Sequence, residues 1–377
     1  MAKLFEPLTI RGVEIKNRVC VSPMSQYKAH NGFANDWHMA HLGRFALGGC
    51  GLVFCEATAV SPEARRTHGD LGLWEDAQVA KLQEINQFIR AQGAVPGVQL
   101  AHAGRKASER RPWHGETPVT DEDISLRGEA PWQALSPTEE PYGELWPPPR
   151  RMTETDIEKV IKDFGDAAKR ADRAGFDIIE VYAAHGFLMH QFYSPLCNDR
   201  DDAWGGSFDN RTRLCVEVAK SIRSHFPANK ALFFRLSATE WLDDGWTVDD
   251  TAKLATELGK HGVDLIDCSS GGIGGNTPAP RFPLGPAFQA ELAAEVRAKS
   301  AIKTMAVGLI WQAHVAEKII ATDQADMVAL ARELLNDPNW ALHAARELES
   351  DSDFSMWDAA MGWWLHKRQR LFDKLGF

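Results

Sequence analysis

Short apolar runs alternate with amphipathic stretches along most of the chain. Eight runs are nearly continuous in hydrophobicity and rich in β-branched residues, which is typical of strands buried on both faces. They are Arg18–Pro23, Leu52–Ala57, Val95–Leu100, Ile178–Ala183, Leu232–Leu236, Leu265–Cys268, Thr304–Val307 and Met327–Ala331. Between them, apolar residues recur every three or four positions, which predicts helices such as Thr153–Ala174, Asn210–Ser224 and Val248–His261. Eight repeated strand–helix units predict one closed α/β barrel, the (β/α)8 or TIM barrel.

The segment from residue 105 to residue 151 interrupts this rhythm. It is rich in Pro, Trp and charged residues, shows no helical period and is too long for an ordinary connection. Because it follows the third predicted strand, it belongs to the carboxyl end of the barrel, where loops surround the active site. We expect an elaborated lid loop or a small hairpin that roofs the site. An insertion with only a packing role is the alternative.

Charge and composition exclude several classes of function. The formal net charge of −10 argues against a nucleic-acid partner, because neutralising phosphates needs a basic face. No window reaches the ~18 apolar residues of a membrane span, and the N-terminus lacks the pattern of a signal peptide. The six cysteines show no metal-binding spacing. We expect one domain over residues 1–377 that is cytoplasmic, binds no metal and touches no membrane.

Polar residues follow the predicted strands at the end where barrels place reactive groups. Arg235 lies in an otherwise apolar strand, and a buried cation needs an anionic or electron-rich partner, such as the pyrimidine ring of a flavin. Gly308 and Arg332 follow the seventh and eighth strands, where barrels commonly bind phosphate. A tight turn at Gly308 and a surface salt bridge at Arg332 are the alternatives.

Five segments carry a resemblance to a known family. They are PMSQY from Pro23, QLAHAGRKA from Gln99, AHGF-x4-FYSPLCNDRDDAWGGSFDNR from Ala184, DLIDCSSGG from Asp264 and ARELLNDPNWA from Ala331. With these motifs the chain resembles the Old Yellow Enzyme family of NADH:flavin oxidoreductases, particularly its thermophilic-like, xenobiotic reductase A-like branch. The resemblance implies a barrel that binds FMN non-covalently and takes electrons from NADPH or NADH. It also implies an ene-reductase, in which hydride passes from flavin N5 to the activated C=C bond of an α,β-unsaturated carbonyl or nitro compound.

The same resemblance implies the residues of the site, position by position. Cofactor contacts are implied for Pro23, Met24, Ser25, Ala57, Gln99, His185, Arg235, Gly308, Ala331 and Arg332. Substrate contacts are implied for the catalytic residues Tyr27, Tyr182 and His185 and for Phe187, Asp267 and Trp364. A homodimer, or an oligomer built from dimers, is expected, in which the tail 355–377 carries Trp364 to the neighbouring subunit's site. Packing of Trp363 and Trp364 within their own subunit is the alternative.

Three positions depart from the family's pattern. Ser25 stands where the branch has a cysteine that contacts the flavin, so we expect a different flavin potential. Tyr182 and His185 stand where the family has His with His or Asn to bind the acceptor's oxygen, and the Tyr182 phenol can still donate there. Phe187 replaces the tyrosine that protonates the α-carbon, and it has no proton to give.

Two other functions stay open beside the ene-reductase, which is our leading hypothesis. Tyr182, His185 and Asp267 resemble the Tyr–His–Asp arrangement of trimethylamine and dimethylamine dehydrogenases, in which Asp267 would orient His185. This would make the chain an FMN-dependent amine dehydrogenase or N-demethylase, although it lacks the cluster-binding cysteines and extra domains of those enzymes. The third hypothesis is a flavin-binding barrel that has lost catalysis.

Overall fold

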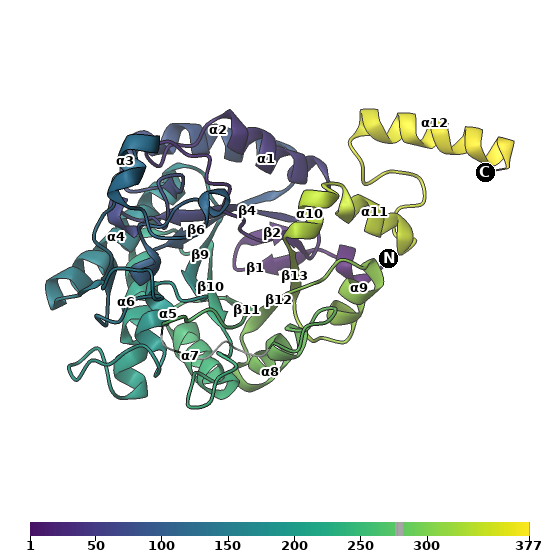
Figure 1. Ribbon diagram of the computed structural model, residues 1–377. Helices are drawn as coiled ribbons and strands as arrows, with labels where there is room; N and C mark the ends of the chain where they lie inside the picture. The colour runs from purple at the N-terminus through teal and green to yellow at the C-terminus, as the bar shows by residue number, and fades with distance from the viewer. Residues whose placement is uncertain (276, 278–281, 377) are drawn as a thin grey trace.

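The computed structural model describes residues 1–275, 277 and 282–376, and its centre is a closed barrel of eight parallel strands (Figure 1). In chain order these strands are β3 (Val19–Val21), β4 (Leu52–Ala59), β6 (Val95–Ala101), β9 (Ile178–Ala183), β10 (Ala231–Ser237), β11 (Leu265–Ser269), β12 (Lys303–Val307) and β13 (Met327–Leu330). Strand β3 pairs with both β4 and β13, which closes the barrel. Each predicted strand overlaps an observed one, so the predicted (β/α)8 barrel is confirmed.

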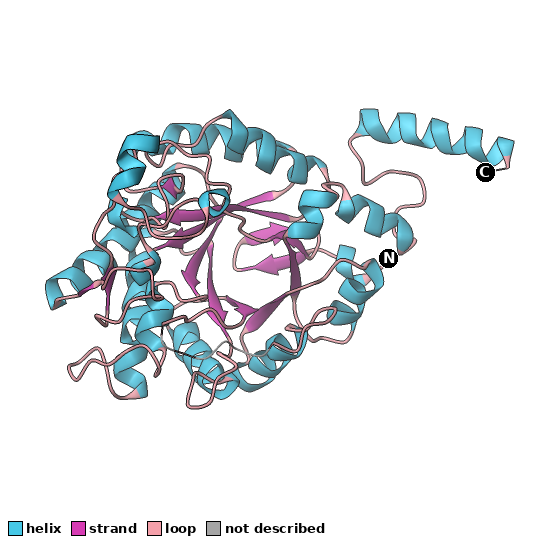
Figure 2. Ribbon diagram, in the orientation of Figure 1, coloured by secondary structure: helices cyan, strands magenta, loops and turns pink. Residues whose placement is uncertain are grey.

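Helices surround the barrel on its outside (Figure 2). The longer ones are α1 (Asp36–Leu47), α2 (Val79–Ala91), α4 (Glu154–Arg173), α6 (Phe208–His225), α7 (Val248–Lys260), α8 (Ala290–Ser300), α9 (Ala313–Ala321) and α11 (Trp340–Glu347). Two short helices, α5 (Leu188–Tyr193) and α10 (Arg332–Asn336), follow β9 and β13. The three predicted helices correspond to α4, α6 and α7. Their sequences are periodic because each helix buries one apolar face.

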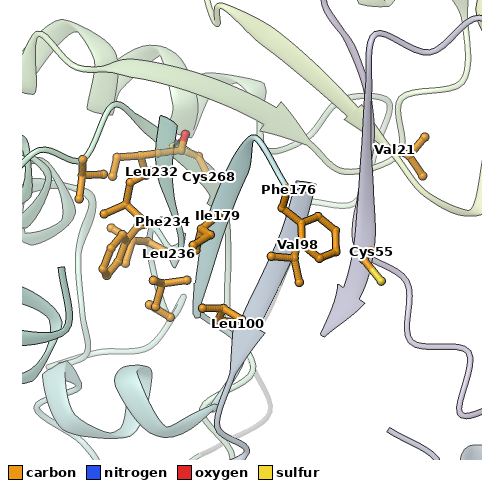
Figure 3. Packing of buried hydrophobic residues seen from close by; sticks show 14 of the residues in the cluster. Val21, Cys55, Val98, Leu100, Phe176, Ile179, Leu232, Phe234, Leu236 and Cys268 are labelled. Carbon is orange, nitrogen blue, oxygen red and sulfur yellow. Dashed lines mark hydrogen bonds between the residues drawn. The ribbon is translucent and has the colours of Figure 1, made fainter. Parts of the chain in front are cut away.

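The strands bury side chains on both faces, and each face has its own apolar core. Outward-facing residues such as Val98, Ile179 and Phe234 pack beneath the helices (Figure 3). Their neighbours along the strands, such as Phe233, point into the barrel and share a cluster with the antiparallel hairpin β1 (Leu8–Ile10) and β2 (Val13–Ile15). The hairpin therefore plugs the amino end of the barrel, and the carboxyl end is left for a binding site.

The segment 105–151 follows β6 as an elaborated loop. It contains helix α3 (Asp121–Arg127) and the two-residue strands β7 (Leu135–Ser136) and β8 (Arg150–Arg151). The strands β7 and β8 run parallel. A short antiparallel pairing of 108–110 with 117–119, centred on the bridge between Glu109 and Pro118, gives the segment a small hairpin as well. The loop reaches the mouth of the barrel, where Arg111 donates a hydrogen bond to the backbone oxygen of Tyr27 at 3.2 Å. Nearby, the short strand β5 (Leu71–Gly72) extends the sheet beside β4.

The C-terminal helix α12 (Ala359–Leu375) stands apart from the barrel (Figure 1). Gly362 is its one buried residue, while Trp363 and Trp364 are 56% and 63% exposed. These exposures contradict the alternative that both tryptophans pack within their own subunit. The last residue of the predicted tail, Phe377, lies outside the described residues.

Two findings bear on the chain as a whole. None of the helices in the described ranges is both long enough and apolar enough to cross a membrane. All six cysteines are buried and carry free thiols.

Phe233 provides a test of the inner core. Its side chain is fully buried, and its ring centroid lies 6.1 Å from that of Phe54. Phe233→Ala should lower the free energy of unfolding by about 3–5 kcal/mol in urea denaturation, because the strands cannot close over the resulting cavity. The control is Leu126→Ala on α3, where the side chain is 62% exposed and the change should stay below about 0.5 kcal/mol. Equal effects of the two variants would contradict the described core.

Candidate active site

Two adjoining cavities open at the carboxyl end of the barrel, with volumes of about 640 and about 360 Å³. They share the lining residues Pro23, Arg235, Ala331 and Arg332. The larger cavity extends over the ends of β11, β12 and β13, and the smaller one over the ends of β4, β6 and β9. Every residue predicted to contact the cofactor lines at least one of the two cavities.

Polar side chains form a layer between the apolar inner core and the smaller cavity. Arg235 lies against Asp267, with 3.3 Å between Nε and Oδ2, and its Nη1 donates to Ser22 Oγ at 2.9 Å. Gln99 donates its side-chain N–H to Glu180 Oε1 at 2.7 Å. In the strand register Arg235 is paired with Asp267, and Gln99 with Glu180. Both contacts therefore follow from the alignment of neighbouring strands.

The contacts within this polar layer leave N–H groups of Arg235 available to a ligand in the cavities above it. Burial, followed by the charge of Asp267, raises the pKa of Glu180, which favours its protonated carboxyl. Asp267 is then the counter-ion of Arg235. The Arg235 Nε is not aligned for a hydrogen bond to Asp267, and Nη2 forms none within the described part of the chain. A guanidinium with unused donors fits the electron-rich pyrimidine edge of FMN.

The far end of the larger cavity fits a phosphate group. Gly308 has a φ of +112°, and a Cβ there would lie 2.5 Å from Nε2 of Gln289. Gln289 is held in place, since it donates to Val307 O at 3.0 Å and accepts from Ser270 Oγ at 2.5 Å. Arg332 lines the same cavity and, as far as the structure describes the chain, forms no ion pair, so the surface salt bridge considered above is not found. A backbone cradle beside a free cation suits the phosphate of FMN.

Tyr182, His185 and Ser269 form a hydrogen-bonded row at the wall of the cavities. Tyr182 Oη lies 2.9 Å from His185 Nδ1, and His185 Nε2 lies 2.6 Å from Ser269 Oγ. The His185 backbone has a φ of +55° and is held by an N–H bond to Ser237 Oγ. Burial, followed by the charge of Arg235, keeps the pKa of His185 well below its usual value, so the imidazole is neutral. Burial also raises the pKa of Tyr182, which keeps its phenolic proton.

Asp267 was expected to contact the substrate and, in the amine hypothesis, to orient His185. The structure contradicts both roles. Asp267 is fully buried against Arg235 and lines neither cavity, and the partner of His185 is Ser269. Asp267 and Ser269 are two positions apart on β11, so their side chains lie on the same face of the strand, the one that faces the barrel interior. Ser269 stands one layer nearer to the carboxyl end, at the height of His185, and Asp267 stands one layer below.

The remaining predicted substrate residues divide between the cavity and the tail. Tyr27, Tyr182, His185 and Phe187 line the smaller cavity, and the Phe187 ring stacks on that of Tyr182 with 4.0 Å between centroids. Trp364 lies on α12 and lines neither of the two cavities of its own chain. Whether it enters a neighbour's site stays a prediction.

Several residues of the site were not predicted. Lys106 and Ser269 lie within the quoted motifs QLAHAGRKA and DLIDCSSGG, so placing those motifs on strand ends would have found both. Arg66 and Asp70 lie on the connection after β4, where no motif or periodicity marks them. Arg66 donates to both carboxylate oxygens of Glu109, at 2.5 and 2.8 Å, and to Tyr27 Oη at 3.2 Å.

Gly308→Ala should weaken FMN binding, because the new methyl group meets Gln289 and the backbone lies at a φ that alanine rarely adopts. We expect at least a ~10-fold rise in the FMN dissociation constant, equivalent to about 1.4 kcal/mol, in fluorescence titrations of flavin-free protein. Gly285→Ala is the matched control, since a Cβ at Gly285 meets nothing within 4 Å. An unchanged dissociation constant for Gly308→Ala would place the phosphate elsewhere.

Comparison with known proteins agrees with this geometry. The family model for the NADH:flavin oxidoreductase / NADH oxidase family matches residues 3–351. An NADH:flavin oxidoreductase from Gibberella zeae is 42% identical over 92% of this chain and 86% of its own length. An NADPH dehydrogenase from Geobacillus thermodenitrificans is 40% identical over 92% of this chain and 94% of its own length.

Solved structures show the same barrel. A 2-naphthoyl-CoA reductase superposes with a TM-score of 0.81 at 25% identity over 92% of this chain, which spans 52% of that larger protein. Morphinone reductase superposes with a TM-score of 0.75 at 24% identity, over 92% of this chain and 90% of its own length. The chain therefore belongs to the NADH:flavin oxidoreductase / NADH oxidase family, as its Old Yellow Enzyme motifs predicted, and is an NAD(P)H-dependent flavin oxidoreductase with FMN as its cofactor.

Proposed function

We propose that the chain is an ene-reductase that reduces the activated C=C bond of α,β-unsaturated carbonyl or nitro compounds. The row of Tyr182, His185 and Ser269 beside the smaller cavity is the observation that carries this proposal. When bound, FMN that NADPH or NADH has reduced supplies the hydride. The side chains of the row bind and polarise the acceptor's oxygen.

The neutral His185 sets the direction of the hydrogen bonds. We assign its one ring hydrogen to Nδ1, so that Ser269 donates to Nε2 and Nδ1 donates to Tyr182 Oη. The phenolic hydrogen of Tyr182 is then free to point into the cavity. A carbonyl or nitro oxygen there accepts this hydrogen, and the bond strengthens as negative charge develops on that oxygen during hydride addition. In the opposite tautomer Tyr182 would donate to His185 and have no hydrogen left for the acceptor.

The rest of the smaller cavity suits a flat, mostly apolar acceptor. Pro23, Ala57, Phe187 and Leu335 contribute apolar walls. The Phe187 ring, stacked on Tyr182, fixes the orientation of the phenol. Apolar walls with few directed polar groups are typical of sites that orient small organic ligands.

The two alternatives gain less support. The amine hypothesis needs a carboxylate on His185, but the partner of His185 is the neutral Ser269. A barrel without catalysis does not fit a chain that belongs to a family of oxidoreductases.

We also propose a homodimer in which α12 packs on a second copy of the chain and Trp364 faces the neighbour's smaller cavity. The support is the apolar surface that the helix leaves exposed in the single chain, at Met361, Trp363, Trp364, Leu371 and Leu375. Exposed apolar area of this kind marks an interaction surface.

Anaerobic stopped-flow absorbance tests the reaction class. Mixing the oxidised holoenzyme with NADPH or NADH should bleach the flavin band, and cyclohexenone or maleimide should restore it. Methylated amines without nicotinamide should leave the band unchanged. Bleaching by an amine alone would contradict the ene-reductase proposal and support the amine alternative.

Tyr182→Phe tests the hydrogen-bond row. Removing the phenol should slow reoxidation of the reduced flavin by cyclohexenone about 10²–10³-fold, the usual effect of losing one donor to a developing oxyanion. FMN affinity, measured by fluorescence titration, serves as the control for an intact site. Reoxidation at the wild-type rate would show that another group binds the acceptor's oxygen.

Trp364→Ala tests the tail, with its neighbour Trp363→Ala as the matched control. The wild-type protein should sediment at twice the 41.9 kDa chain mass, and deletion of residues 358–377 should release monomers. Trp364→Ala should raise the KM for cyclohexenone several-fold, about 1 kcal/mol for one lost aromatic contact, and Trp363→Ala should not. A monomeric wild-type protein would contradict the proposed dimer.

A further inference from the structure

The ammonium group of Lys106 lines the smaller cavity. Lys106 ends the 3-10 turn Gly104–Lys106 that follows β6, and the residue is 7% exposed. Its Nζ donates one hydrogen bond, to the backbone oxygen of His185 at 3.0 Å. In the described ranges no carboxylate lies within ion-pair distance of it. Since an ammonium has three N–H donors, two are not used by the described residues.

Aromatic rings and charges of both signs surround this group. Nζ lies 4.7 Å from the ring centroid of Tyr142 and 5.6 Å from that of Phe187. The ionisable side chains that act on it are His185 after β9, Arg66 after β4, and Arg105, Glu109 and Glu116 of the segment 105–151. Burial, followed by the charge of Arg66, lowers the pKa of Lys106 from 10.5 to about 7. Near neutral pH, therefore, Lys106 both carries a proton and gives it up readily.

Reduction of a C=C bond needs a proton as well as a hydride. Once the β-carbon has gained the hydride, negative charge rests on the α-carbon and the conjugated oxygen, and the α-carbon must be protonated. Phe187 has no ionisable group. Burial raises the pKa of Tyr27 to about 12, and Tyr182 is engaged with the acceptor's oxygen.

Asp70 also lines the cavity, and burial raises its pKa to about 6, but its carboxyl oxygens are engaged by other partners. Both of its carboxylate oxygens already accept hydrogen bonds, from Thr67 Oγ1 at 2.7 Å and from the Arg66 N–H at 2.7 Å. Among the described side chains that line the cavity, Lys106 combines free N–H donors with a proton that is readily released.

We propose that Lys106 is the general acid of acceptor reduction, and that it supplies the proton which Phe187 cannot give. This inference rests on the proposed ene-reductase function. The π bond of the acceptor breaks as the β-carbon gains the hydride, whose two electrons come from NAD(P)H. The α-carbon forms its new C–H bond as the Lys106 N–H bond breaks, and the amine regains a proton from water before the next turnover.

Two variants separate the proton of Lys106 from its charge. In single turnovers of the reduced holoenzyme with 2-methylcyclohexenone, Lys106→Met should slow flavin reoxidation ~10²–10⁴-fold. Lys106→Arg keeps the positive charge but holds its proton near neutral pH, so it should be slowed similarly. Lys253→Met, at an exposed lysine of α7, is the matched control and should react at the wild-type rate. A wild-type rate in Lys106→Met or in Lys106→Arg would overturn the proposal.

The pH dependence and the product give two further readouts. The wild-type rate of reoxidation should fall as the pH rises through about 7, because the protonated form is the acid, and Lys106→Met should lose this limb. A donor fixed on one side should also give 2-methylcyclohexanone of one configuration at the α-carbon, whereas Lys106→Met should give a lower enantiomeric excess. An unchanged pH profile and an unchanged excess in Lys106→Met would overturn the proposal.

A measurement without turnover examines the amine itself. Acetylation of Lys106 by acetic anhydride in the wild-type holoenzyme, followed by peptide mass spectrometry, should be half-maximal near pH 7. Acetylation that titrates at the ordinary lysine value of ~10.4 would overturn the proposal, even where a variant fails to fold. If the wild-type protein does not reduce enones, the proposed function fails together with this role. Enone reduction that is insensitive to Lys106 overturns this inference alone.

Discussion

The buried guanidinium of Arg235 is the constraint on which the site depends. A cation inside a barrel is stable only with a partner, and Asp267 and Glu180 both lie within its reach in the same layer. Burial and the neighbouring charge of Asp267 raise the pKa of Glu180, because two buried carboxylates beside one arginine disfavour each other's ionisation. Below this layer the barrel is apolar and closed by the β1–β2 hairpin. Above it lie the two cavities, so the charged layer separates the part that stabilises the fold from the part that binds ligands.

Strand alternation builds the next layer from the same strands. Two positions after Arg235 on β10 comes Ser237, and two positions after Asp267 on β11 comes Ser269. These serines hold His185 from two sides: Ser237 accepts its backbone N–H, and Ser269 contacts its ring. Ser237 in turn donates to Gly271 O at 2.7 Å. The left-handed backbone of His185 is therefore kept in place by side chains of strands rather than by its own loop, which places the imidazole rigidly.

Much of this architecture is predictable from the sequence, and the limits have physical causes. Hydrophobic continuity located all eight strands because each is buried on both faces. Motifs contained most of the predicted cofactor residues that line the cavities, and Arg235 and Gly308 were found from their places in and after predicted strands. The motifs did not decide between Asp267 and Ser269, since both face inward and only the height of the layer selects the partner of His185. Arg66 was missed because its position depends on Glu109, a residue far away in sequence.

The unusual residues of the smaller cavity form one connected arrangement. The Tyr182 ring stacks on Phe187, and the Lys106 ammonium lies over the Phe187 ring, so the three side chains follow one another along the wall. A tyrosine at 187 would add a polar group beside that ammonium, whereas the phenyl ring offers it only a π face. Contact with the rings of Phe187 and Tyr142 favours the charged amine, and burial opposes it. Burial and the charge of Arg66 outweigh this contact and leave Lys106 able to exchange a proton near neutral pH, in a cavity whose other lining cations are the guanidinium groups of Arg66, Arg235 and Arg332.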